Sequence, residues 1–186
     1  MNYLFVPFGS NESNSELLSM GTLWASNAAK DPRGKEAPKL LFYNIKAAKP
    51  LSIIGNNDTV YILAHGYAAS PDYIFNLANF PAMGMSPNEL GIRLKVAGLG
   101  AGHRKIKLYI CNSSGAFQTF ATEFKRIMRD NLGFANIDIY YYNCSVSVPK
   151  EFSDGLYHKD GVLENAMGNI VLTPRFRASE NRQRVP

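Results

Sequence analysis

The stretch Thr59-Val60-Tyr61-Ile62-Leu63-Ala64 predicts a buried β-strand that runs directly into His65-Gly66. A second apolar stretch, Lys105-Ile106-Lys107-Leu108-Tyr109-Ile110, runs into Cys111 in the same way. When two such strands lie in one parallel sheet, their carboxyl ends point to the same rim, where open α/β sheets place their ligand sites. An imidazole and a thiol on that rim are a candidate base and a candidate nucleophile.

Helical patterns alternate with these strands. The sequence Ser86-Pro87-Asn88-Glu89 has the form of a capping box and predicts a helix that begins between the two strands. A stripe of apolar residues from Phe117 to Met128 predicts another helix, and 136–142 read as a further strand. The alternation over 59–144 favours right-handed crossovers, and therefore an α/β fold with a mainly parallel central sheet and helices on its faces.

The flanking segments complete one domain. We expect strands over 2–8, 40–45 and 169–173, a helix over 16–29 and a hairpin over 155–161. A length of 186 residues is enough to bury a core without disulfide or metal staples. We therefore predict a single domain over 1–177, followed by a disordered tail over the polar residues 178–186.

The composition argues against several classes of protein. The apolar runs are far shorter than the ~20 residues of a membrane span, and the N-terminus carries no secretory signal. The two cysteines are too few for a disulfide framework, so we expect a cytoplasmic protein, or one exported without a classical signal peptide. No C-x-x-C or H-E-x-x-H motif is present, which argues against a metal site.

The chain is basic, with a formal net charge of +5. The simplest interpretation is a solvated basic surface. Nucleic-acid binding has little support, because no recognised binding motif accompanies the charge. The third interpretation is the capture of a polyanionic small molecule, since clustered arginines and lysines match multivalent phosphate well.

The order and spacing of these motifs resemble those of a known fold. An apolar strand ending in His65-Gly66, a capped helix and an apolar strand ending in Cys111 resemble the caspase-like fold of clan CD cysteine peptidases. Over 59–145 the likeness is greatest to the self-cleaving cysteine protease domains of large bacterial toxins. It implies a caspase-like three-layer α/β/α sandwich and a cysteine peptidase, of the bacterial effector or toxin type, that cleaves protein or peptide substrates through a thioester.

The resemblance assigns catalysis to a dyad of Cys111 and His65, and an oxyanion site to the backbone N–H groups of Gly66 and Cys111. A free thiol is mostly protonated at neutral pH, and a helix beginning near Ala116 would favour the thiolate. His65 either removes the thiol proton or, as an imidazolium, holds the thiolate by charge. The residue before the nucleophile is Ile110, where the toxin domains often have a small one, and no motif identifies the acidic partner of the histidine found in some of them.

Two further groups of residues are candidates for the site. Asn143, Cys144 and Ser145 follow the strand expected at 136–142, where they either line a substrate cleft or pack in the core. His103 lies before its strand, on the opposite rim, and is interpreted as structural.

The toxin domains are switched on by inositol hexakisphosphate held in a basic pocket. By resemblance, the residues that would form such a pocket here are Lys150, Lys159, Arg175 and Arg177. A solvated surface is the alternative interpretation of these four residues. The resemblance implies no other cofactor.

Two other functions compete with the peptidase. The segment Val60–Tyr67 also resembles the strand and oxyanion loop of serine esterases with the α/β-hydrolase fold. Those enzymes need a G-x-S-x-G nucleophile elbow, which this sequence lacks. The third possibility is a catalytically inactive binding module that keeps the fold, and the reactivity of the Cys111 thiol distinguishes it from the peptidase.

Overall fold

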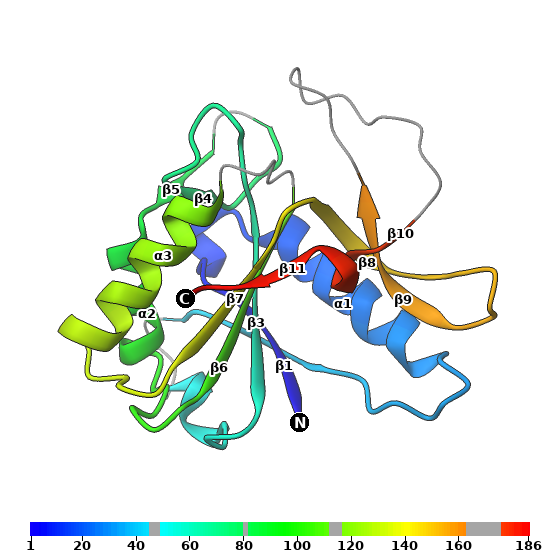
Figure 1. The fold of residues 1–186 in the computed structure, drawn as a ribbon, viewed down its shortest axis with the longest axis horizontal. Helices are drawn as coiled ribbons and strands as arrows, with labels where there is room; N and C mark the ends of the chain where they lie inside the picture. The colour runs from blue at the N-terminus through cyan, green and yellow to red at the C-terminus, as the bar shows by residue number, and fades with distance from the viewer. Residues whose placement is uncertain (45–48, 80–81, 112–116, 163–175) are drawn as a thin grey trace.

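A mainly parallel β-sheet lies at the centre of the computed structural model, which describes residues 1–44, 49–79, 82–111, 117–162 and 176–186 (Figure 1). The strands of its main path are β1 (Asn2–Val6), β2 (Lys39–Phe42), β3 (Thr59–His65), β6 (Lys105–Cys111), β7 (Asp138–Tyr142) and β11 (Arg182–Arg184). They lie in the order β11-β7-β6-β3-β1-β2. The edge strand β11 runs antiparallel to β7, and every other neighbouring pair on this path is parallel.

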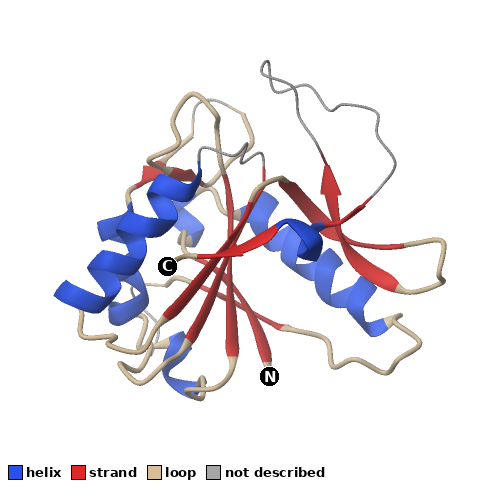
Figure 2. Ribbon diagram, in the orientation of Figure 1, coloured by secondary structure: helices blue, strands red, loops and turns tan. Residues whose placement is uncertain are grey.

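Helices cover both faces of this sheet, as Figure 2 shows. The helix α1 (Ser15–Ala29) packs on one face, and α2 (Pro87–Val96) and α3 (Gln118–Arg126) pack together on the other, with α3 continuing as a π-helical turn η4 (Ile127–Asn131). Two 3₁₀ turns, η1 (Ser10–Glu12) and η2 (Pro50–Ile53), precede α1 and β3. The α/β fold with a mainly parallel central sheet is therefore confirmed, in an arrangement compatible with three α/β/α layers.

The local chemistry expected from the sequence accounts for these elements. Every residue of β3 is buried, as expected for a parallel strand covered on both faces. The capping box begins α2: Ser86 Oγ accepts the Glu89 N–H at 3.3 Å, and the Glu89 carboxylate accepts the Ser86 N–H at 2.7 Å. The apolar face of α3 buries Phe120 and Phe124 completely.

A second, antiparallel sheet packs beside α1. It consists of β8 (Ser145–Glu151), β9 (Tyr157–Val162) and β10 (Phe176–Arg177), in the order β10-β9-β8. A hairpin is present, but its strands are β8 and β9 and its turn lies between 151 and 157, so the segment expected to form the whole hairpin, 155–161, forms mainly its second strand. The strand expected over 169–173 lies outside the described residues. Two short strands, β4 (Ile74–Phe75) and β5 (Gly84–Met85), pair with each other beside the end of β3.

The prediction of a disordered tail over 178–186 is wrong. The segment forms a 3₁₀ turn, η5 (Ala178–Asn181), and then β11, which pairs with β7. Ala178 is fully buried and Val185 is 2% exposed. The polar composition that suggested disorder is that of an edge strand, whose charged side chains face solvent while its backbone pairs with the sheet.

Candidate active site

His65 and Cys111 end neighbouring parallel strands at the same level. They are register partners in β3 and β6, at the end of a ladder that begins with Val60 opposite Ile106. Neighbouring strands lie about 4.8 Å apart in the hydrogen-bonding direction. The sheet thus brings together, at the carboxyl ends of both strands, the two residues that the sequence selects as base and nucleophile.

The topological switch point of the sheet lies at this rim between β1 and β3, so His65 borders it and Cys111 lies one strand further on. After β1 the chain adds β2 on one side, and then adds β3, β6 and β7 on the other. Open α/β sheets bind ligands outside the carboxyl ends of the strands at such a reversal. Because the chain passes directly from β1 into η1 and α1, the beginning of α1 is also brought to this rim.

Glu16, in the first turn of α1, is the acidic neighbour of His65. Its Oε1 lies 3.5 Å from Nε2 of His65, whose side chain is 4% exposed while that of Glu16 is 42% exposed. Neither imidazole nitrogen has a hydrogen-bond partner within the described part of the chain. Burial lowers the pKa of His65, and the charge of Glu16 partly opposes this shift. His65 is therefore a neutral base near neutral pH, which favours the first of the two roles considered for it.

No local motif links residues 16 and 65, so the sequence alone does not identify Glu16 as a neighbour of His65. Asp31, which also lies upstream, instead binds the guanidinium of Arg33 and the ammonium of Lys35. The usable signal was topological: an acidic residue opens the helix that follows the first strand, at a switch point next to the histidine.

An ion pair holds the connection that carries Glu16. The Arg93 guanidinium donates to both carboxylate oxygens of Glu12, at 2.5 and 2.7 Å, and to the carbonyl of Pro7 at 2.9 Å. It also lies 4.7 Å from the centre of the Tyr43 ring. The two-bonded ion pair of Arg93 and Glu12 therefore fixes the segment between β1 and α1 against α2, which lies on the face of the sheet opposite to α1.

Aromatic side chains border His65 on the side of β4. Phe75 is the register partner of His65, and its ring centre lies 4.5 Å from that of Tyr67. The Tyr67 hydroxyl donates to the carbonyl of Leu77 at 2.6 Å. Tyr73 and Met83, on the same short hairpin, are 47% and 41% exposed. This side of the site is therefore apolar and partly accessible.

The other site residues predicted from the sequence do not all lie at the rim of His65 and Cys111. Gly66 is buried directly after β3. Asn143 is exposed, and its N–H donates to the carbonyl of Asn181 at 2.9 Å. Cys144 and Ser145 are each 3% exposed, and burial raises the pKa of the Cys144 thiol to about 11. These two residues therefore pack in the core, the alternative left open by the sequence.

The helix expected near Ala116 is described from Gln118 onward, and Ala116 itself lies outside the described residues. His103 is buried, with Nε2 2.9 Å from the carbonyl of Lys105 and Nδ1 3.3 Å from that of Gly55. Its role is structural, as the sequence indicated.

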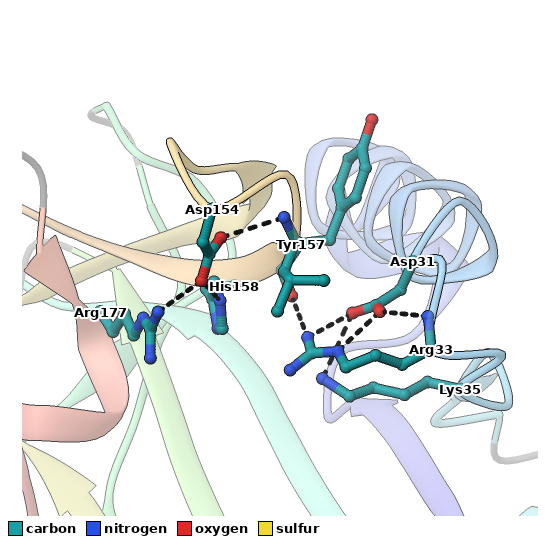
Figure 3. Close-up of polar contacts among 8 residues, drawn as sticks. Asp31, Arg33, Lys35, Asp154, Tyr157, His158 and Arg177 are labelled. Atoms are coloured by element: carbon teal, nitrogen blue, oxygen red, sulfur yellow. Dashed lines mark hydrogen bonds and ion pairs between the residues drawn. The ribbon is translucent and has the colours of Figure 1, made fainter.

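Of the basic residues proposed for a polyanion pocket, the three that the structure describes do not lie on one face: Lys150 and Arg177 share a face of the small sheet, and Lys159 lies on the other. Lys150 pairs with the buried carboxylate of Asp160 at 3.0 Å, and Arg177 pairs with Asp154 at 2.5 Å, as Figure 3 shows for the second pair. Lys159, one position from Asp160 on β9, lies on the opposite face of the small sheet, because side chains alternate along a strand. Arg175 lies outside the described residues.

No protein-family model matches the chain, and neither does any curated protein sequence. Among the described residues, no helix has the length and apolar character needed to span a bilayer. Nor do three or more histidine, cysteine, aspartate or glutamate side chains gather into a potential metal site within these residues.

Proposed function

We propose that this protein is a cysteine peptidase in which Cys111 is the nucleophile and His65 the general base. The observation that carries the proposal is the register of β3 and β6, which aligns the two residues at the carboxyl ends of neighbouring parallel strands, with His65 next to the switch point between β1 and β3. The buried, neutral imidazole and the nearby carboxylate of Glu16 supply the electrostatics that such a base requires.

The proposed reaction has two halves. In the first, neutral His65 accepts the proton of the Cys111 thiol, and the thiolate attacks the carbonyl carbon of the scissile peptide bond. The N–H groups of Gly66 and Cys111 stabilise the oxyanion that forms. The imidazolium then gives its proton to the departing amine, and the acyl group remains on Cys111 as a thioester. In the second half His65 takes a proton from water, the resulting hydroxide attacks the thioester, and the acid product leaves as the thiol is restored.

In this proposal Glu16 stabilises the protonated, charged form of His65. Proton transfer to His65 creates an imidazolium in a buried position, which is unfavourable without a nearby negative charge. The carboxylate at 3.5 Å from Nε2 offsets part of this cost. Glu16 is therefore a positioning and electrostatic residue that acts through His65.

An inositol phosphate activator is a separate proposal, which rests on the resemblance. A polyanion at the face that holds Lys150 and Arg177 would have to displace the carboxylates of Asp160 and Asp154. Melting the protein with about 1 mM inositol hexakisphosphate tests it, because a ligand bound at micromolar affinity must raise the midpoint. An unchanged midpoint would leave an enzyme that needs no such activator.

Selective alkylation of the thiols tests the peptidase proposal. We expect iodoacetamide to label Cys111 near neutral pH much faster than Cys144, whose buried thiol serves as an internal control. The His65→Ala variant should lose most of this advantage. A peptide library should be cleaved by the protein and not by Cys111→Ala. Equal, slow labelling of both cysteines would support the inactive binding module, and labelling by a serine-directed fluorophosphonate would support the esterase.

A further inference from the structure

A cavity of about 350 Å³ opens on the α1 face of the main sheet, away from the rim that carries His65. Its walls come from the end of α1, the connection over 31–38, the start of β1 and β3, and the β8–β9 hairpin. The lining side chains that matter here are Trp24, Asp31, Lys35, Glu36, Tyr61 and Lys159. A volume of this size lies within the range of small-molecule sites.

Two lysines meet at one phenolic oxygen in this region. The Lys159 ammonium donates to the Tyr61 hydroxyl at 2.8 Å, and the Lys107 ammonium donates to the same oxygen at 3.1 Å. Lys159 Nζ lies 4.3 Å from the centre of the Tyr61 ring and 5.5 Å from that of Trp24. Within the described part of the chain, neither lysine forms an ion pair with a carboxylate.

The carboxylates near the cavity are engaged elsewhere or exposed. Asp31 is buried, but it accepts hydrogen bonds from Arg33 at 2.7 and 2.5 Å and pairs with Lys35 at 3.2 Å (Figure 3). The same guanidinium donates to the carbonyl of Tyr157 at 3.3 Å, which ties this wall to β9. Glu36 is exposed to solvent. The charge on Lys159 is therefore left without a close counterion.

This environment makes Lys159 an unusually weak base. Burial is the main cause, and the positive charges of Arg182 and Lys35 add to it, so that the pKa of Lys159 falls to about 7. Burial also lowers the pKa of Lys107, which approaches from β6. The Lys159 amine thus meets the rings of Trp24 on α1 and Tyr61 on β3, together with the Tyr61 hydroxyl. The charges of Lys107 on β6 and Arg182 on β11 also act on it. The 31–38 connection adds the cation Lys35, together with the carboxylates of Asp31 and Glu36 described above.

We propose that Lys159 is a nucleophilic amine that condenses with the aldehyde group of a small ligand bound in this cavity. In its neutral form the amine keeps an N–H for the Tyr61 hydroxyl and has a lone pair for the carbonyl carbon. Formation of the C–N bond moves the carbonyl π pair to oxygen, and a proton passes from nitrogen to that oxygen. Loss of water then gives the imine, so the step balances without an oxidant or reductant.

The neighbouring cations indicate the class of ligand. Lys35 lines the cavity, and the positive charges of Lys107 and Arg182 act on Lys159 from outside its lining. These charges would attract a negative group on the same molecule, so we expect an aldehyde that carries a phosphate or carboxylate. The proposal is independent of the peptidase. Tyr61 lies four residues before His65 on β3, about 13 Å along the strand, and the imine chemistry does not use Cys111.

Reductive labelling of the full chain tests the inference. Pyridoxal 5′-phosphate with cyanoborohydride near pH 7 should modify Lys159 at least about 100-fold faster than Lys150, because an ordinary lysine is almost wholly protonated at that pH. The rate at Lys159 should rise with a midpoint near the pKa of about 7. Peptide mapping by mass spectrometry reports both sites, and Lys150, whose side chain is 41% exposed, is the matched control.

Two further experiments test the role of the neighbouring charge and the need for an aldehyde. Arg182→Gln removes an exposed cation, so it should raise the midpoint of the labelling profile while the fold is retained. Pyridoxine 5′-phosphate, which has an alcohol in place of the aldehyde, should slow labelling by competition and form no adduct. Labelling of Lys159 no faster than that of Lys150, or a rate that climbs to about pH 10 without a midpoint near 7, would overturn the proposal.

Discussion

Glu16 Oε1 lies 3.5 Å from Nε2 of His65, although the two residues belong to different layers of the fold. The contact exists because α1 starts at the switch point, next to the last residue of β3. It gives the buried imidazole a negative neighbour at the position where a proton transfer would create a positive charge.

Neutralising this carboxylate should therefore change the pH dependence of the site. Glu16 raises the pKa of His65 against the effect of burial, so Glu16→Gln should lower that pKa further. We expect the acid limb of Cys111 alkylation to move to lower pH, by a small amount because Glu16 is partly exposed. The rate of iodoacetamide labelling measured against pH reports the shift. Glu180→Gln, an exposed change in η5, should leave the profile in place, and an unmoved profile in Glu16→Gln would remove the electrostatic role.

The Arg93–Glu12 pair should matter for stability far more than an exposed pair of the same kind. The two side chains are only 17% and 15% exposed, so removing one partner leaves a poorly solvated charge. Arg93→Ala should lower the free energy of unfolding by about 3 kcal/mol, as measured by urea denaturation. Arg129→Ala breaks a pair that is 53% and 42% exposed, and should cost about 0.5 kcal/mol or less. Similar losses in both variants would contradict this interpretation.

The C-terminal strand should be an integral part of the domain. Removing 178–186 exposes the surface that Ala178 and Val185 cover and the free edge of β7. We expect the truncated chain to lose at least about 2 kcal/mol of stability in urea denaturation, the scale of burying one aliphatic side chain. Gln183→Ala, an exposed change in β11, should be nearly neutral. A truncated chain as stable as the full one would show that the tail is dispensable.

Much of the fold followed from strands whose burial leaves a simple sequence signature. The apolar run of β3 is continuous because helices cover both faces of the sheet, and the capping box marks the beginning of α2. Parallel pairing predicted that the two strand ends share a rim, whereas the register that makes His65 and Cys111 direct partners comes from the structure.

What the sequence did not predict depends on long-range geometry. Glu16 reaches His65 only because of the strand order, and β11 is an edge strand whose polar side chains resemble those of a disordered tail. The resemblance grouped Lys159 with Lys150, although alternation along β9 places Lys159 on the other face, against Tyr61. In each case the deciding contact joins segments that are distant in the chain.

Two buried histidines should make the protein less stable in mild acid. Burial lowers the pKa of both His65 and His103 in the folded state, whereas an unfolded histidine titrates near 6.5. As the pH falls through about 6.5, the unfolded chain binds protons that the folded chain does not, so the stability that is fully present above this value decreases.

We expect urea denaturation to show a free energy of unfolding that falls between about pH 7 and 5.5, by at most about 1.4 kcal/mol per pH unit for each histidine. Asp58 and Glu12 have lowered pKa values and add to the loss only at more acidic pH, because their unfolded values lie near 4. His103→Asn should flatten the slope in the histidine window, since it removes one of the two buried imidazoles. A stability that is constant or rises as the pH falls to 5.5 would show that these imidazoles are not held neutral by burial.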